Sequence, residues 1–158
     1  MGAEELWVES YQGEVLGEAL FAALAERQED PERRRQLDVL TLLETSTKRL
    51  AEPVFEKREL DRGDTAATVA QAKELADAVA GIAWEEFLGS FAGITAQFLE
   101  KYAQLVDLAP DAEERRVAEA YVAHEHALAS FARRALGEES GEPLELILAL
   151  PHVTAIAV

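Results

Sequence analysis

The sequence predicts an all-α protein whose main feature is an antiparallel four-helix bundle. Apolar residues recur at spacings of three and four along four long segments, which is the period of an amphipathic helix. Proline and glycine interrupt these segments, leaving two short connections and one long one between them. The chain has 158 residues, of which 49% are apolar and 29% charged, as in a folded globular protein. We therefore expect a single domain over residues 1–158.

Charge and cysteine content exclude several classes of function. A net charge of −16 disfavours nucleic acids and anionic membranes as partners, because both are bound by clusters of Lys and Arg. The absence of cysteine excludes disulfides and thiolate chemistry. No apolar run approaches the roughly 20 residues needed to cross a bilayer, and the first residues do not resemble a signal peptide. We expect a cytoplasmic protein.

The first predicted pair of helices covers residues 4–28 and 31–52. Asp30 is a suitable N-cap for the second helix, because Pro31 at the first helical position lacks only an N–H that would be unbonded anyway. Pro53 is expected to end or kink this helix. The inner face of the first helix is expected to carry Trp7, Tyr11, Glu14, Glu18, Phe21 and Ala25. That of the second is expected to carry Leu37, Leu40, Glu44, Thr47 and Ala51.

Residues 53–81 are expected to form a crossover between the two pairs. Asp64 or Thr65 can cap a helix over residues 65–80, and Gly81 is expected to separate it from the next helix. Two helical pairs joined by one long connection is the topology of ferritin-like bundles, whereas a simple up-down bundle needs only short loops.

The second predicted pair of helices covers residues 82–108 and 111–136. Asp111 with Glu114 resembles a capping box, and Gly137 stands at the expected C′ position. The face expected to be buried on the first helix of this pair carries Trp84, Phe87, Phe91, Ile94, Phe98, Tyr102 and Leu105. On the second helix it carries Val117, Tyr121, His124, Leu128, Phe131 and Ala135.

The last predicted element is a largely apolar tail over residues 143–158. A short helix is expected to begin at Pro143, and the β-branched, uncharged end of the tail has the composition of an aggregation-prone segment if exposed. We therefore expect the tail to pack against the bundle or against a second chain in a homodimer, with the dimer favoured.

The two predicted pairs resemble copies of one helical hairpin. Gly13 and Gly17 bracket Glu14 in the same way that Gly89 and Gly93 bracket Ser90. From Glu14 to Glu44 is 30 residues, and from Ser90 to Tyr121 is 31. Glu44 precedes Thr47 by three residues, and Tyr121 precedes His124 by three.

With this repeat the chain resembles the ferritin-like superfamily, and rubrerythrin-like proteins in particular, over residues 4–52 and 82–136. The Gly-Glu pair at Glu14, with Phe21 seven residues later, resembles the first ligand segment of that family, and His124-Glu125 resembles its last. The resemblance implies a di-iron site, in which each hairpin supplies a Glu from its first helix and a Glu-x-x-His from its second.

Only half of the implied ligand set is present. The six positions carried over from the family are Glu14, Glu44, Thr47, Ser90, Tyr121 and His124, and only Glu14, Glu44 and His124 match the family's residue types. Glu85 or Glu86, about one turn before Ser90, can substitute if the register shifts, so Glu86 is a fourth candidate. Three scattered ligands do not hold two metals, whereas one metal bound by Glu14, Glu44, His124 and water is chemically reasonable.

Two functions follow from this incomplete set. The favoured one is a binding or structural bundle without di-iron chemistry and without a cofactor, in which the polar residues of the inner faces satisfy one another. The alternative is a metal-binding protein or metal-dependent oxidoreductase that uses Glu14, Glu44 and His124 with iron or another divalent metal. Either reading leaves the substrate undefined, and whether the chain is an enzyme stays open. His126 and His152 are expected to face solvent.

Overall fold

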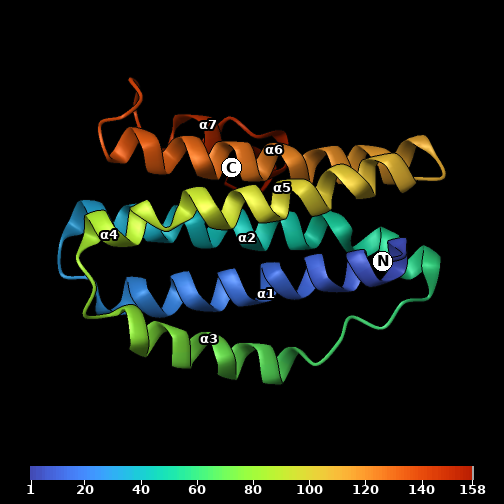
Figure 1. Cartoon of the computed structure of the whole chain (residues 1–158), viewed down its shortest axis with the longest axis horizontal. Coiled ribbons are helices and arrows are strands. Elements are labelled where there is room, and N and C mark those ends of the chain that lie inside the picture. Colours follow the sequence, from blue (N-terminus) through green and yellow to red (C-terminus); the bar gives the residue numbers. More distant parts are fainter. Residues whose placement is uncertain (158) are drawn as a thin grey trace. The chain divides into compact units, whose positions relative to one another are not determined.

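The computed structural model describes residues 1–157, and this range contains eight helices and no strand, which confirms the all-α class (Figure 1). None of these helices has both the length and the apolar composition needed to cross a membrane. The chain divides into two compact units. One comprises Trp7–Gly81, and the other comprises residues 1–6 with the chain from Ile82 onward.

The first unit is built on the hairpin of α1 (Ala3–Arg27) and α2 (Pro31–Arg58). The two helices are antiparallel, because Tyr11 hydrogen-bonds to Glu52 while Glu18, two turns later, binds Lys48. Asp30 caps α2 by accepting hydrogen bonds from the amides of Glu32 and Arg33. The inner-face residues expected on both helices are buried, except Glu18, which is half-buried.

Pro53 does not end α2, so the boundary expected at residue 52 was wrong. The helix continues for five residues and ends at Arg58, where Glu59 adopts the left-handed conformation. The reason is tertiary packing: Val54 and Phe55 are buried, and the Phe55 ring lies 5.0 Å from that of Tyr11. This burial offsets the backbone hydrogen bond that proline removes.

The first unit also contains α3 (Thr65–Val79), close to the helix expected over residues 65–80 (Figure 1). Of the two predicted caps, Asp64 and Thr65, it is Asp64 that caps the helix, by accepting from the amide of Ala67. Within the first unit α3 runs parallel to α1, since Gln12 bonds to Thr68 and Arg27 bonds to Asp77. Only Ala72 and Ala76 of α3 are buried, so it presents a narrow stripe of small side chains.

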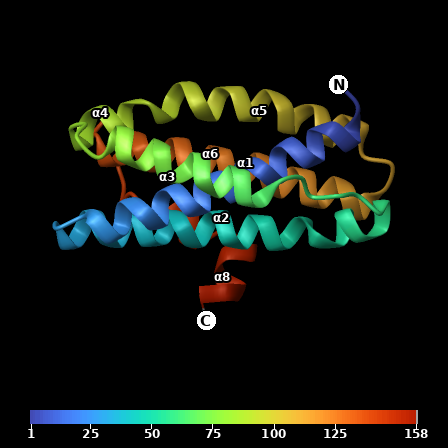
Figure 2. The same ribbon diagram turned by 90° about the horizontal axis from the view of Figure 1, so that it is seen from below.

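The second unit is built on α5 (Phe91–Leu108) and α6 (Ala112–Ala135), which pack against each other (Figure 2). They are antiparallel: Phe91 contacts Phe131, and Tyr102 contacts Tyr121. Asp111 caps α6 through the amide of Glu114, as predicted. The residues expected on the inner face of α6 are buried, apart from the half-buried Ala135.

The single helix expected over residues 82–108 is instead two helices, α4 (Trp84–Gly89) and α5, with Ser90 between them. The buried face also differs from the expected one. Ile94 is 48% exposed, whereas Leu88 and Thr95 are buried. Thr95 can occupy this position because its hydroxyl donates to the backbone carbonyl of Phe91.

The tail forms two short helices, α7 (Glu145–Leu148) and α8 (Pro151–Ala157). The expected helix therefore begins at residue 145 and not at Pro143. α7 packs against α6, and α8 packs against α7. Leu144, Ile147 and Val153 are fully buried within the chain, so a large part of the tail is covered without a second copy. Residue 158 lies outside the described residues.

We predict that Ile147→Ala lowers the free energy of unfolding by about 2–4 kcal/mol, because it leaves a cavity at a fully buried position. Leu108→Ala is the matched control: Leu108, at the end of α5 in the same unit, is 47% exposed, so its truncation should change stability by less than about 0.5 kcal/mol. Urea denaturation followed by circular dichroism measures both. Equal effects of the two substitutions would contradict the packing described for α7.

Candidate functional site

The first unit holds a pair of buried carboxyl groups, Glu14 on α1 and Glu44 on α2, which are 1% and 6% exposed. Their side chains share a hydrogen bond. Because an ionised carboxylate only accepts hydrogen bonds, this contact requires a proton on one of the two groups. Burial raises the pKa of Glu44 to about 7, although the hydrogen bond from Glu14 opposes this effect. The pair therefore retains a proton in the neutral range.

Gly17 makes room for the Glu44 carboxyl group. A Cβ atom at position 17 would lie 2.6 Å from both Cδ and Oε1 of Glu44. The corresponding glycine of the second hairpin, Gly93, has nothing within 4 Å of such a Cβ atom. The repeated glycine thus has a steric role in one hairpin only.

A charged pair lies next to these carboxyl groups. Lys48 donates to Glu18 at 2.7 Å, and the Thr45 hydroxyl also donates to Glu18. Both side chains of the ion pair are about three-quarters buried. Glu18 acts on Glu44 electrostatically and raises its pKa further, so the carboxyl pair and the ion pair form one electrostatic group.

The second unit holds a buried imidazole, His124, beside the buried carboxyl group of Glu125 on the same helix. His124 Nε2 lies 3.7 Å from Glu125 Oε1, which is too long for a hydrogen bond. Burial, assisted by the charge of His152, lowers the pKa of His124 to about 3. His124 is therefore neutral at pH 7 and forms no ion pair with Glu125, and a neutral imidazole is the form that binds metals.

The remaining positions carried over from the ferritin-like pattern are Thr47, Ser90 and Tyr121. The first two donate hydrogen bonds to nearby backbone carbonyls, and the third packs on another ring. The Thr47 hydroxyl donates to the carbonyl of Leu43 in its own helix. Ser90 is exposed at the break between α4 and α5, where its hydroxyl donates to the carbonyl of Phe87. Tyr121 is buried with its ring edge-to-face on Tyr102, at 5.1 Å between centroids.

The proposed substitutes for the missing carboxylate, Glu85 and Glu86, are both exposed in the first turn of α4. They therefore lie in water, whereas His124 of the same unit is 1% exposed. His126 is exposed as expected. His152 was expected to face solvent but is half-buried, and burial lowers its pKa.

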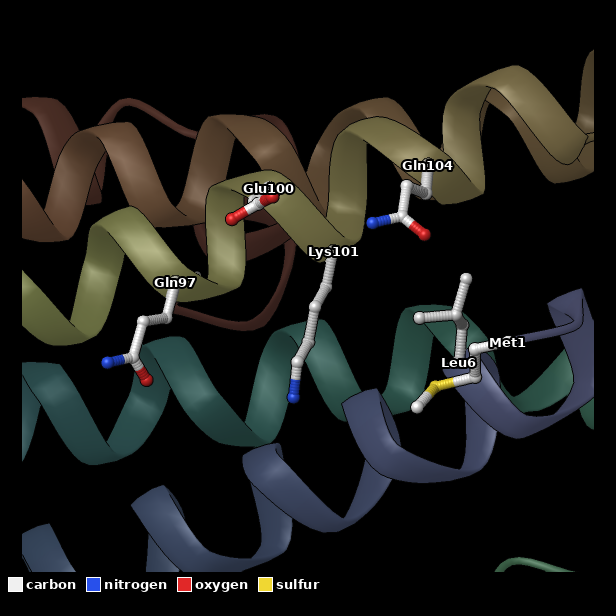
Figure 3. A pocket seen from close by; sticks show the side chains of 6 residues that line it. All are labelled: Met1, Leu6, Gln97, Glu100, Lys101 and Gln104. Carbon is white, nitrogen blue, oxygen red and sulfur yellow. The ribbon is translucent and has the colours of Figure 1, made fainter.

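A surface hollow of about 300 Å³ also lies in the second unit. Figure 3 shows that its lining comes from α5 and from the N-terminal segment. The lining residues are Met1, Leu6, Gln97, Glu100, Lys101 and Gln104. The hollow is open to solvent, and its polar walls are flexible surface side chains, so it lacks the enclosed, preformed character of a binding pocket.

Within either compact unit by itself, and among the described residues, no three side chains of metal-ligating type come together. The buried ionisable groups that the structure describes are the carboxyl pair of Glu14 and Glu44 in the first unit, and His124, Glu125 and Glu114 in the second. Sequence reasoning identified Glu14, Glu44 and His124, but it missed the steric role of Gly17. The signal for that role was the glycine itself, which is unfavourable inside a helix.

Comparison of the chain with models of protein families, with curated proteins and with solved structures found no match.

We predict that Gly17→Ala destabilises the protein, although replacing glycine by alanine inside a helix normally stabilises it by about 1 kcal/mol. The added Cβ would force the buried Glu44 carboxyl group to move. Gly93→Ala, with open space around the new methyl group, should stabilise by the usual amount. Urea denaturation of both variants tests the pair. An increase in stability for Gly17→Ala would contradict the close contact with Glu44.

We predict that the free energy of unfolding of Glu44→Gln increases, relative to that of the wild type, as the pH rises. The pKa of Glu44 in the folded protein is about 7, above its ordinary value of 4.5. The folded state therefore binds the proton more tightly, and the stability that this supplies is complete below pH 4.5 and is lost as the pH rises to about 7. Glutamine does not titrate.

The measurement is the difference in unfolding free energy between the two proteins at several pH values from 4 to 8. The contribution of His124, which is lost as the pH falls from 6.5 towards 3, is common to both and cancels. Parallel stability curves for the two proteins would show that Glu44 does not titrate as described.

Proposed function

We propose that the chain is a ferritin-like four-helix bundle that acts as a binding or structural protein and has no di-iron chemistry. Each unit supplies one antiparallel hairpin of helices, α1 with α2 and α5 with α6. The matching spacings from Glu14 to Glu44 and from Ser90 to Tyr121 support a common origin of the hairpins. In this proposal the hairpins associate as a single domain, whose cytoplasmic location stays a prediction.

The observation that carries the proposal concerns three of the six positions where the family has iron ligands. In this chain these positions hold residues of other types, which make contacts with neighbouring residues. Thr47 bonds to its own helix, Ser90 is exposed at a helix break, and Tyr121 packs on Tyr102. A di-iron centre needs several carboxylates and two histidines to bind the metals and balance their charge. With these three positions unavailable, the remaining ligands fit at most one metal.

The second candidate function is the binding of one divalent metal by Glu14, Glu44 and His124. It is favoured by the presence of two buried carboxyl groups in the first unit and of a buried, neutral imidazole in the second, because groups of these types bind divalent metals. Glu86 is exposed and is therefore not part of this proposal. Carboxylate and imidazole donors suit iron, manganese or zinc.

Elemental analysis tests the absence of a di-iron centre, on which the favoured function depends. For protein purified without chelator we expect far fewer than two iron atoms per chain and no binuclear optical spectrum after aerobic reconstitution with Fe²⁺. The physical reason is that only half of the ligand set is available. Two tightly bound irons per chain would overturn the favoured function.

Thermal denaturation with Fe²⁺, Mn²⁺ or Zn²⁺ tests the second function separately. A metal that binds only the folded state raises the melting temperature, and the increase grows with the logarithm of its concentration divided by its Kd. Under the favoured function no such increase occurs. If an increase is found, is lost in His124→Asn, and persists in the control His126→Asn, then the second function is correct.

A homodimer is the remaining proposal about partners. α7 leaves Leu146 and Leu148 partly exposed, although other residues of the tail are buried, and residues 146–157 carry no Asp, Glu, Lys or Arg. Two copies of a chain with a net charge of −16 can approach most easily where charge is absent. Light scattering after size exclusion should give a dimer for the wild type and a monomer for Leu146→Glu/Leu148→Glu. A monomeric wild type would rule out the dimer.

A further inference from the structure

The C-terminal strap, defined here as residues 137–157, is fastened to the end of α6 by the guanidinium group of Arg134. This side chain is only 14% exposed. Its Nε donates to Glu139 Oε2 at 2.6 Å, and its Nη1 donates at 3.1 Å to the Glu142 carbonyl and to Glu145 Oε2. One cation therefore binds three successive parts of the strap.

These contacts of Arg134 with Glu139, Glu142 and Glu145 are called the latch below. Glu139 is the main acceptor in the latch. In addition to Arg134, the Ser130 hydroxyl and the Arg133 guanidinium group donate to its carboxylate. These hydrogen bonds, that of Ser130 first, lower the pKa of Glu139 to about 2. The latch thus remains charged through the mildly acidic and neutral range, and it depends on ionic strength more than on pH.

In the loop that carries Glu139, two glycines have positive φ angles, and one of them lies against the guanidinium group of Arg134. Gly141 has a φ of +121°, and a Cβ atom at this position would lie 2.7 Å from both Cζ and Nη1 of Arg134. Gly137 has a φ of +78°. Glycine is needed at position 141 for its backbone conformation and also for the close approach of the arginine.

Beyond the latch the strap consists of two short helices. α7 has four residues and α8 has seven, and helices this short do not persist in water without tertiary contacts. The fully buried side chains that the structure describes in the strap are Leu144, Ile147 and Val153. Short helices held by three such side chains open at a lower free energy than the long helices on which they rest.

The stretch of α6 beneath the strap is unusually well covered. Every residue from 127 to 132 is buried, whereas an amphipathic helix normally leaves one side in water. α7 packs against α6, and His152 in α8 is close enough for its charge to act on His124. The strap therefore supplies cover for the half of α6 that carries His124.

From the latch, the two glycines and the sparse apolar anchoring we infer that the C-terminal strap is a lid that opens on its own. It is held closed by Arg134, and it uncovers the C-terminal half of α6 while the α5–α6 hairpin stays folded.

Hydrogen–deuterium exchange measured by mass spectrometry tests this inference on the full chain. In Arg134→Gln the amides of residues 144–154 should exchange faster than in the wild type, on the order of tenfold, because hydrogen bonds to a charged group are lost. Peptides of α5 and α6 should be unchanged. Arg115→Gln is the matched control, since Arg115 lies on the same helix and its ion pair with Glu119 is exposed.

Ionic strength provides a second measurement that needs no variant. Raising NaCl from 0.1 to 1 M should speed exchange of the strap in the wild type, because salt screens the latch, and should have much less effect in Arg134→Gln. Two results would overturn the inference. One is a strap that exchanges as slowly as α6 under all conditions, and the other is a salt effect equal in both proteins. If Arg134→Gln does not fold, the salt dependence of the wild type decides.

Discussion

The proton shared by Glu14 and Glu44 is the constraint on which the first unit depends. Two carboxyl groups that are nearly inaccessible to water can remain in a helical core only if they do not both ionise. Their hydrogen bond meets this requirement, and the missing side chain of Gly17 provides the space for it. Neighbouring residues are consistent with this arrangement: Glu18, which remains paired with Lys48, contributes a negative potential that favours keeping the proton.

In the second unit the buried imidazole of His124 is accommodated by the loss of its charge and not by a shared proton. His124 loses its charge through burial, so it needs no counter-ion, and the adjacent Glu125 does not form an ion pair with it. Aromatic packing surrounds this part of the hairpin, with Tyr102 against Tyr121 and Phe91 against Phe131. The charged contacts of the unit are concentrated instead at the end of α6, where Arg134 organises the strap.

The two hairpins thus share a sequence repeat but differ in the residues at its polar positions. At corresponding positions one has Glu44 and Thr47, and the other has Tyr121 and His124. Each residue is accommodated locally, by a shared proton, a backbone-directed hydroxyl, an edge-to-face ring contact or a neutral imidazole. These residue types at the corresponding positions are the physical basis for proposing a bundle without a di-iron centre.

Periodicity and capping residues were sufficient to predict the helices, because both act within a few residues of the chain. Asp30, Asp64 and Asp111 cap the helices that were expected to follow them, and the inner faces of α1, α2 and α6 were read correctly from spacing alone. Burial of Glu14, Glu44 and His124 also followed from their places on those faces.

Only the tertiary structure decided that α2 continues past Pro53, because the outcome depends on the contact between Phe55 and Tyr11. It likewise decided that Thr95 replaces Ile94 in the core and that Gly17 accommodates Glu44. These outcomes depend on residues far apart in the sequence, and a local pattern carries no information about which distant side chain will fill a given space.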